Sequence, residues 1–203
     1  MLSRAEIVDF DDSAPPAGAA GPWVGGAAPA TGIEVTGPDP AWPQQYDALA
    51  GRIRQALGWR VLYLEHVGST SVPGLAAKPI IDIDLAVADP DREQDYVPAL
   101  ETTGFRLAIR EPWWYGHRVL RDGPRCNLHV FGAGAPELIR HRLFRDWLRG
   151  NPGERDLYAA AKRRAAAEAN AGGEHVEQYN ARKEQVLREI YHRAFAAAGL
   201  LDD

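Results

Sequence analysis

The sequence lacks a set of cysteines and any long hydrophobic run, and these two absences narrow its class. One cysteine, Cys126, occurs in 203 residues, which excludes a disulfide framework and a Cys-rich zinc site and fits a reducing compartment. The longest uncharged stretch, residues 13–33, consists mainly of Ala, Gly and Pro, so it is not hydrophobic enough to span a membrane. The first twelve residues carry acids where a signal peptide needs an apolar run. We therefore expect a cytoplasmic protein that does not associate with a membrane.

An excess of positive charge is also missing. The chain has 23 Lys and Arg against 28 Asp and Glu, for a formal net charge of −5, and this balance disfavours a dedicated nucleic-acid binder. Hydrophobic residues make up 45% and charged residues 25% of the chain, which is ordinary for a globular protein. The length is sufficient for one domain with a sizeable core.

Glycine and proline are concentrated at the N-terminus. Sixteen of the nineteen residues from 14 to 32 are Ala, Gly or Pro. Such a segment has few side chains to bury, so burial cannot offset the conformational entropy that the segment would lose on ordering. We therefore expect residues 1–32 to form a flexible extension, with an acidic segment at residues 6–12. The alternative is a strand over residues 6–10 and an arm that Trp23 and Val24 anchor on a neighbouring surface.

Hydrophobic periodicity divides residues 33–203 into a mixed part and a helical part. The class expected is α/β (α+β), a mixed sheet flanked by helices with a C-terminal helical bundle over about residues 137–199. Helical spacing predicts helices at residues 39–57, 92–103, 137–149, 154–171 and 174–198. Alternation predicts strands at residues 33–35, 61–67, 80–87 and 105–110, and a hairpin of residues 118–120 with 126–131.

Two polar features follow one another at a short distance in the middle of the chain. Gly68 and Ser69 come directly after a predicted strand, where a glycine lets backbone approach a ligand and free N–H groups can hold phosphate oxygens. Asp82 and Asp84 lie on the next strand, and their spacing places both carboxylates on one face. Such carboxylates repel each other unless a cation lies between them, and Mg²⁺ suits them. The pair predicts a phosphate-binding loop beside a metal site, although each half alone is also typical of an ordinary turn and of a solvated strand face.

The segment from Glu65 to Leu85, EHVGSTSVPGLAAKPIIDIDL, resembles the GrpB family of the nucleotidyltransferase (polymerase-β-like) superfamily. Residues 39–43, 104–105, 127–131 and 144–149 are similar to that family as well. The resemblance covers about residues 33–195. It implies that Gly68 and Ser69 hold a triphosphate and that Asp82 and Asp84 hold Mg²⁺.

The superfamily often has a third carboxylate on a later strand, and this sequence departs from that pattern. The matching strand carries Asn127 and His129 on one face. His129 is a candidate base or ligand near neutral pH; the alternative is a structural histidine beside the site. The missing acid puts polymerase-like chemistry in doubt.

Several further residues are candidates for binding, each with a plain structural alternative. Thr70 and Ser71 would add hydroxyls to the phosphate loop or cap a short helix at residues 72–77, and Lys78 would contact phosphate or lie in solvent. The aromatic residues 113–115 would stack on a planar substrate or close the core. The tentative substrate-binding residues are His66, Arg118, Arg125, Asn127, Arg145, Lys162, Tyr179 and Lys183.

The sequence supports three functions. The leading expectation is an enzyme that uses ATP or another nucleoside triphosphate with Mg²⁺ and transfers a nucleotidyl group to a small-molecule acceptor, or activates and ligates a carboxylate. The second is a nucleotide- or metabolite-binding module without turnover. The third is an accessory interaction protein. The acceptor, the nucleotide and the existence of a homo-oligomer stay open.

Overall fold

A five-stranded mixed sheet lies at the centre of this computed structural model, which describes residues 2–10 and 15–201. The sheet order is β1-β2-β5-β4-β3, and β2 and β5 pair in parallel while the other neighbours are antiparallel. The parallel register places Asp82 beside Asn127 and Asp84 beside His129. The expected mixed sheet is confirmed, with strands β1 (Tyr63–Val67), β2 (Ile81–Val87), β3 (Arg106–Glu111), β4 (His117–Asp122) and β5 (Cys126–Gly132).

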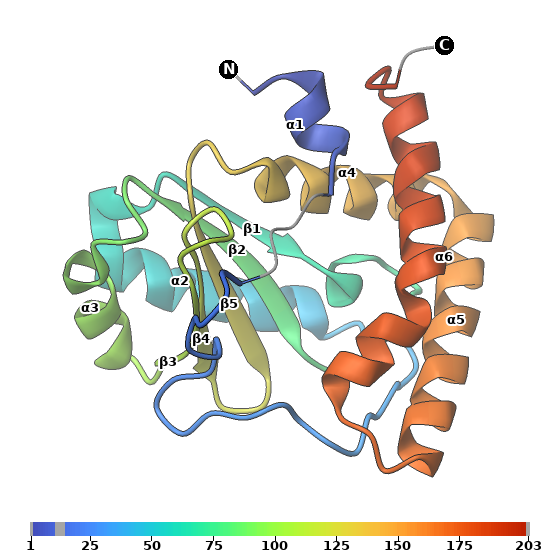
Figure 1. Cartoon of the computed structure of the whole chain (residues 1–203), viewed down its shortest axis with the longest axis horizontal. Helices are drawn as coiled ribbons and strands as arrows, with labels where there is room; N and C mark the ends of the chain where they lie inside the picture. The colour runs from blue at the N-terminus through green and yellow to red at the C-terminus, as the bar shows by residue number, and fades with distance from the viewer. Residues whose placement is uncertain (1, 11–14, 202–203) are drawn as a thin grey trace.

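Six α-helices in the described ranges surround the sheet (Figure 1). The expected helix over residues 92–103 is broken into a 3₁₀ turn, Glu93–Asp95, and a short helix that has Pro98 in its first turn. The helix expected at residues 72–77 is replaced by a 3₁₀ turn, Ser69–Ser71, and the strand at 33–35 by one bridge between Thr36 and Ala77. The helices are α1 (Arg4–Val8), α2 (Trp42–Leu57), α3 (Val97–Glu101), α4 (Pro136–Gly150), α5 (Pro152–Ala171) and α6 (Val176–Ala197).

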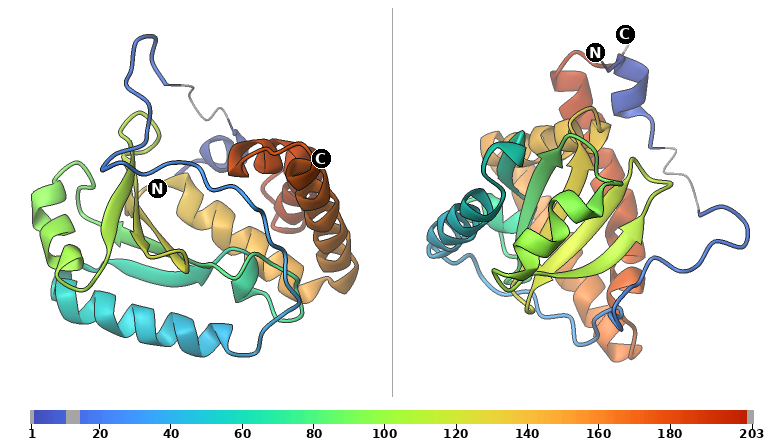
Figure 2. Two further views of the ribbon diagram at one scale, coloured as in Figure 1. Left: turned by 90° about the horizontal axis from the view of Figure 1, so that it is seen from below. Right: turned by 90° about the vertical axis from the view of Figure 1, so that its left-hand side faces the viewer.

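The two faces of the sheet differ in chemistry because strand side chains alternate. Ile81, Ile83 and Leu85 of β2 are fully buried in the main core together with apolar residues of α2 and α3. Asp82 and Asp84 point to the opposite face, which α4 covers (Figure 2, left). The polar residues of β2 and β5 are therefore enclosed between the sheet and the C-terminal helices.

Helices α4, α5 and α6 pack on one another in the described chain and form the expected helical part. Phe144 of α4, Tyr158 of α5, and Tyr191 of α6 are buried together, with ring centroids 5.3 Å apart for Phe144–Tyr158 and 4.5 Å for Phe144–Tyr191. This apolar cluster fixes the helices that face the polar side of the sheet.

The N-terminal extension differs from the flexible segment expected, because its described residues make specific contacts. The strand considered as an alternative at residues 6–10 is not formed either: helix α1 occupies residues 4–8 and buries Ile7 against the C-terminal helices. Trp23 pairs with Ile109 at the free edge of β3, and Thr31 pairs with His175 before α6. The extension therefore crosses from the helices to the sheet edge and back (Figure 1). Residues 11, 12 and 14, which belong to the expected acidic segment and linker, lie outside the described residues.

Among the described residues, no helix combines the length and the apolar character that crossing a bilayer requires.

Candidate active site

Two adjoining cavities lie between the polar face of the sheet and the C-terminal helices. They share Gly68, Ser69, Tyr158, Asn180 and Lys183. The smaller, about 230 Å³, is lined in addition by Lys78, Ile80, Asp82, Lys162 and Tyr179 and is here called the lysine compartment. The larger, about 620 Å³, reaches His129 and His141 and a set of aromatic rings and is called the aromatic compartment. The two form one site with a cationic part and an apolar part.

Gly68 ends β1 in a conformation that other residues rarely adopt. Its φ is +66°, and a Cβ at this position would lie 2.5 Å from Asp82 Oδ2. A side chain here would therefore be strained and would collide with the carboxylate. The glycine lets the loop approach Asp82 and directs Ser69 toward the lysine compartment.

The expected hydroxyls of Thr70 and Ser71 are turned into the loop. Thr70 Oγ1 donates to the Ile80 carbonyl and is 3.0 Å from His66 Nε2, and Ser71 Oγ donates to the Gly68 carbonyl. Both residues are buried, so they hold the loop rather than adding oxygen atoms to the cavity wall.

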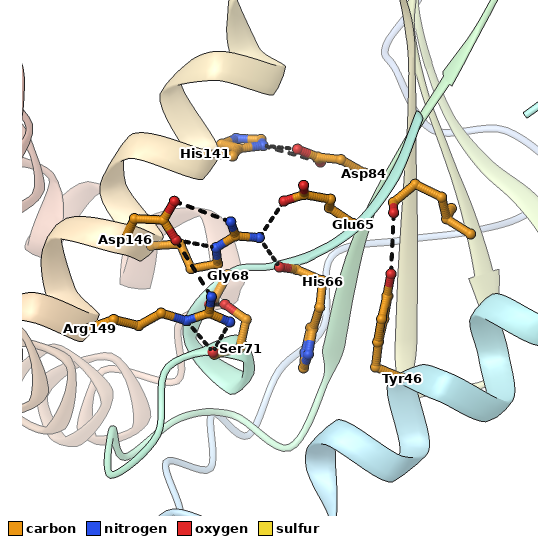
Figure 3. Close-up of polar contacts among 11 residues, drawn as sticks. Tyr46, Glu65, His66, Gly68, Ser71, Asp84, His141, Asp146 and Arg149 are labelled. Atoms are coloured by element: carbon orange, nitrogen blue, oxygen red, sulfur yellow. Dashed lines mark hydrogen bonds and ion pairs between the residues drawn. The ribbon is translucent and has the colours of Figure 1, made fainter. Parts of the chain in front are cut away.

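His66 braces the same loop from behind. Its ring stacks on Tyr46 with centroids 4.8 Å apart, and burial lowers its pKa to about 4 despite the nearby Asp82. The imidazole is therefore neutral at physiological pH and acts as a packed hydrogen-bonding partner. The labelled side chains of Tyr46 and His66 lie beside β1 in Figure 3.

Asp82 is the carboxylate that opens on the lysine compartment. Asn127 Nδ2 donates to its Oδ1 at 2.9 Å, and His129 Nε2 lies 3.7 Å from the same oxygen. Burial raises the pKa of Asp82, but the hydrogen bonds and charge from His129 and Asn127 outweigh it, so its pKa lies below the ordinary value. Asp82 is therefore ionised, and the two β5 residues that share its face orient it.

Asp84 pairs with His141, a residue that the sequence analysis did not single out. The Asp84 side chain is fully buried, and His141 Nδ1 of α4 lies 3.1 Å from one carboxylate oxygen and 2.9 Å from the other (Figure 3). Burial lowers the pKa of His141, but the charge and hydrogen bonds of Asp84 raise it by more, so that the pKa is about 9. An imidazolium therefore balances Asp84. The only signal in the sequence is a histidine within an amphipathic helix, which is equally typical of a solvated position.

His129 belongs to a chain of polar contacts that crosses β5, β4 and β3. Its Nδ1 is 3.1 Å from His117 Nε2, and His117 Nδ1 is 2.7 Å from Glu111 Oε2. Burial holds the pKa of His117 well below its usual range, so this ring is neutral. The contacts fix the ring of His129 with its Nε2 toward Asp82.

Three lysines converge on the lysine compartment from separate parts of the chain. Lys162 is buried and its Nζ lies 2.8 Å from Ser69 Oγ, while Lys78 and Lys183 lie over the ring of Tyr179. Burial, reinforced for Lys162 by Lys183 and Arg163, lowers the pKa of Lys162 to about 7, and burial lowers that of Lys183 to about 8. The pKa of Lys78 is also lowered, mainly by burial. The lysine compartment therefore brings three ammonium groups together, and Asp82 alone does not balance their positive charge.

Two of the three arginines expected near a substrate, Arg118 and Arg125, lie away from the two compartments. Arg118 is buried in ion pairs with Asp91 and Glu93, and Arg125 is exposed at the turn before β5, where its carbonyl accepts from Ile81 N–H. Neither residue lines the two compartments, because Arg118 is paired with local carboxylates and Arg125 lies exposed at the hairpin turn.

Arg145 holds the loop of residues 68–71 from outside the two compartments. It is buried, pairs with Glu65 and Asp146, and its Nη1 donates to the His66 carbonyl at 3.0 Å. One turn later Arg149 donates to the Ser71 carbonyl (Figure 3). The expected substrate contact of Arg145 is therefore replaced by a brace that anchors both ends of the loop.

The aromatic residues 113–115 separate in the structure. Trp114 lines the aromatic compartment and packs edge-on against His117 and Phe131, whereas Tyr115 is exposed. The sequence did not single out the other rings of this wall, because they come from helices distant in the chain.

Asp82 and Asp84 differ in how well they meet the coordination requirements of Mg²⁺. No group of three His, Cys, Asp or Glu side chains in the described ranges has the arrangement of a metal site. Mg²⁺ commonly takes one or two carboxylates and completes its shell with phosphate oxygens and water. Asp82 fits such a role, because it is ionised and faces the compartment across the close approach of Gly68. Asp84 would serve as a second ligand only in exchange for His141.

The sequence was compared with known proteins. Residues 32–193 match the family model described as "GrpB protein". The chain belongs to the GrpB family. UPF0157 protein BH1888 of Halalkalibacterium halodurans is 51% identical over 160 residues, which cover 78% of this chain and 80% of that protein. A crystal structure of conserved protein GrpB from Enterococcus faecalis has a TM-score of 0.71 and 32% identity, and the match covers 81% of this chain and 99% of that one. The resemblance noted in the sequence is thereby confirmed for family and fold.

A longer protein contains a related segment. The dephospho-CoA kinase of Mycolicibacterium paratuberculosis is 32% identical over 190 residues, which cover 80% of this chain but 46% of that protein. This GrpB-family chain therefore corresponds to less than half of the kinase.

Proposed function

We propose that this GrpB-family protein binds a nucleoside triphosphate with its polyphosphate in the lysine compartment and transfers the nucleotidyl group to a small-molecule acceptor. The observation that carries the proposal is the convergence of Lys78, Lys162 and Lys183 on Ser69 and Asp82 in a single cavity. Several cations with lowered pKa values in one cavity repel each other, and a multiply charged anion removes that repulsion. A polyphosphate has both the charge and the length to contact all three ammonium groups.

The loop geometry supports the same ligand. Gly68 allows the backbone to approach closely, and Ser69 presents its hydroxyl next to the Lys162 ammonium. Such a loop and a positioned lysine hold phosphate oxygens by hydrogen bonds and charge. The loop is fixed before any ligand arrives, because Arg145 and Arg149 hold its two ends. Preorganised donors of this kind stabilise charge without reorganisation at the reacting step.

Mg²⁺ is the metal proposed, with Asp82 as its first protein ligand and Asp84 as a second ligand once His141 is displaced. When bound, the ion would neutralise charge on the reacting phosphate. In the transfer itself, an acceptor oxygen or nitrogen forms a bond to the α-phosphorus, and the bond to the departing pyrophosphate breaks. Lys162 and Lys183 stabilise the negative charge that collects on the pyrophosphate. His129 is the nearest candidate to take the acceptor's proton, since β5 places it beside Asp82.

A nucleotide-binding module without turnover is the second candidate function. The observation that favours it is the pairing of both Asp84 oxygens with His141, which leaves one carboxylate of the pair available. The relative named dephospho-CoA kinase is compatible with nucleotide handling in either form. Because the match covers 46% of that protein, kinase activity itself is not proposed for this chain.

Pyrophosphate release distinguishes the two candidates. The purified protein is incubated with ATP and Mg²⁺ and a mixture of acceptor amines, alcohols and carboxylates, and pyrophosphate is measured over time. The enzyme proposal expects release that falls at least 100-fold in Asp82→Asn, a size typical of losing a group that acts at the transferring phosphate. Equal rates in the wild type and Asp82→Asn contradict transfer at this site, and tight binding of ATP without release supports the binding module.

A further inference from the structure

One face of helix α6 runs along both compartments and gives the site a direction. Asn180, Lys183, Leu187 and Tyr191 follow one another at three- and four-residue spacing, and each lines the aromatic compartment. Lys183 also lines the lysine compartment, whereas Tyr191 lies eight residues further along the helix. At a rise of 1.5 Å per residue this offset is about 12 Å, so the apolar end of the site lies beyond the phosphate end.

Apolar side chains from five separate segments line the aromatic compartment. They are Trp114, Phe144, Tyr158, Leu187, Tyr191 and Phe10. Ring faces and edges of this kind favour a planar, apolar body over a sugar or a polyanion. A volume of about 620 Å³ is within the range of cavities that bind small organic ligands.

Charges in this wall are locally balanced. Glu137 pairs with Arg140, and Arg188 Nη2 donates to the Glu184 carboxylate at 3.0 Å. The aromatic compartment therefore lacks the concentrated positive charge of the lysine compartment and does not select a second anion.

Phe10 belongs to the N-terminal extension, which lies outside the family match over residues 32–193. Its ring packs against Tyr191 at 5.0 Å and Phe195 at 5.7 Å, and the Arg188 guanidinium lies over it at 4.1 Å. The extension is fixed just before Phe10, because buried Arg140 donates to the carbonyls of Glu6, Ile7 and Asp9. Phe10 is thus a fixed part of the wall.

We propose that the aromatic compartment is the acceptor subsite, that it takes an uncharged planar aromatic or heteroaromatic group, and that Phe10 of the N-terminal extension determines this specificity. The inference rests on the proposed function for the identity of the partner in the lysine compartment. The binding of an aromatic group at Phe10 is nevertheless measurable without any nucleotide or turnover.

The test uses indole as the aromatic probe and inorganic tripolyphosphate as the anionic probe, with the full-length protein. Dissociation constants of both probes are measured by nuclear magnetic resonance for the wild type, Phe10→Ala and the control Trp23→Ala. Trp23 belongs to the same extension but contacts the β3 edge. We expect Phe10→Ala to weaken indole binding about five- to tenfold, as loss of an aromatic contact does, and to leave tripolyphosphate binding unchanged. Trp23→Ala should change neither.

Unchanged indole binding in Phe10→Ala overturns the inference, and so does an equal loss in Trp23→Ala. Hydrogen exchange shows whether Phe10→Ala also releases residues 2–9 from the helices. If it does, Leu187→Ala replaces it as the test, because Leu187 lines the same compartment from α6. Leu187→Ala should also weaken indole binding, and an unchanged indole affinity in this variant overturns the inference. Absence of tripolyphosphate binding in the wild type, with indole binding intact, instead contradicts the proposed function alone.

Discussion

Gly68 and Asp82 approach so closely that residue 68 has no room for a side chain: a Cβ there would meet Asp82 Oδ2 at 2.5 Å. The contact joins the loop after β1, which we propose binds phosphate, to the carboxylate of Asp82 in β2. The two halves of the motif recognised in the sequence are thus packed directly against each other.

Substitution of Gly68 should lower the free energy of unfolding. Gly68→Ala adds the strain of an extended backbone with positive φ, a conformation essentially restricted to glycine, of about 1–3 kcal/mol, and a collision that costs about 1–3 kcal/mol more. Gly74→Ala is the matched control, since its φ is +80° but its Cβ would lie 3.5 Å from the nearest atom. Urea unfolding of both variants measures the difference; equal losses would show that the contact with Asp82 adds nothing.

The lysine compartment should make stability depend on pH. The pKa of Lys162 is about 7 in the folded protein against 10.5 for an ordinary lysine, so between these values the unfolded chain binds the extra proton. The free energy of unfolding therefore gains from Lys162 as the pH rises from about 7 toward 10. Denaturation of the wild type and Lys162→Met at pH 6, 7.5 and 9 should show a smaller rise in the variant. The same pH dependence in both proteins contradicts the lowered pKa.

Binding of a polyphosphate should reverse that shift and take up protons. An anion beside Lys162 and Lys183 favours their charged forms, whose pKa values are about 7 and about 8 in the free protein. Titration calorimetry of ATP at pH 8 in buffers of different ionisation enthalpy should therefore report net proton uptake, reduced in Lys162→Met. Heats that are independent of the buffer would exclude the coupling.

The arginine brace should control the loop from outside the cavity. Arg145→Ala removes the hydrogen bond to the His66 carbonyl and the pairing with Glu65 and Asp146, which we expect to cost about 2–4 kcal/mol because the side chain is buried. Arg142→Ala, an exposed arginine on the same helix, is the control and should cost less than about 0.5 kcal/mol. Thermal unfolding compares them; a similar small effect in both would rule out the brace.

The sequence predicts the sheet, and the position of the loop that follows β1, because both depend on local patterns. Alternation in β2 places Asp82 and Asp84 on one face, and alternation in β5 places Asn127 and His129 beside them. A glycine between a strand and a serine-rich turn is similarly informative without any knowledge of the tertiary structure.

Contacts between distant segments are the part that the sequence does not predict. His141 reaches Asp84 across 57 positions, and the helical periodicity of α4 does not show which strand its face covers. The N-terminal extension is predicted to be flexible from composition, yet Ile7 and Phe10 are among the few apolar side chains that dock it on the C-terminal helices. Arg118 and Arg145 carry the positive charge that an anionic substrate needs, but both form ion pairs with neighbouring carboxylates instead.

The central claim is that the lysine compartment holds the polyphosphate of a nucleotide. Its most direct test is the dissociation constant of ATP with Mg²⁺, measured by titration calorimetry for the wild type, for the double variant Lys162→Met/Lys183→Met, and for Arg164→Met, an exposed cation two residues after Lys162. The account predicts a loss of at least 30-fold in the double variant, about 2 kcal/mol for two charged hydrogen-bonding groups, and no change in Arg164→Met. Equal affinity in all three proteins would contradict it.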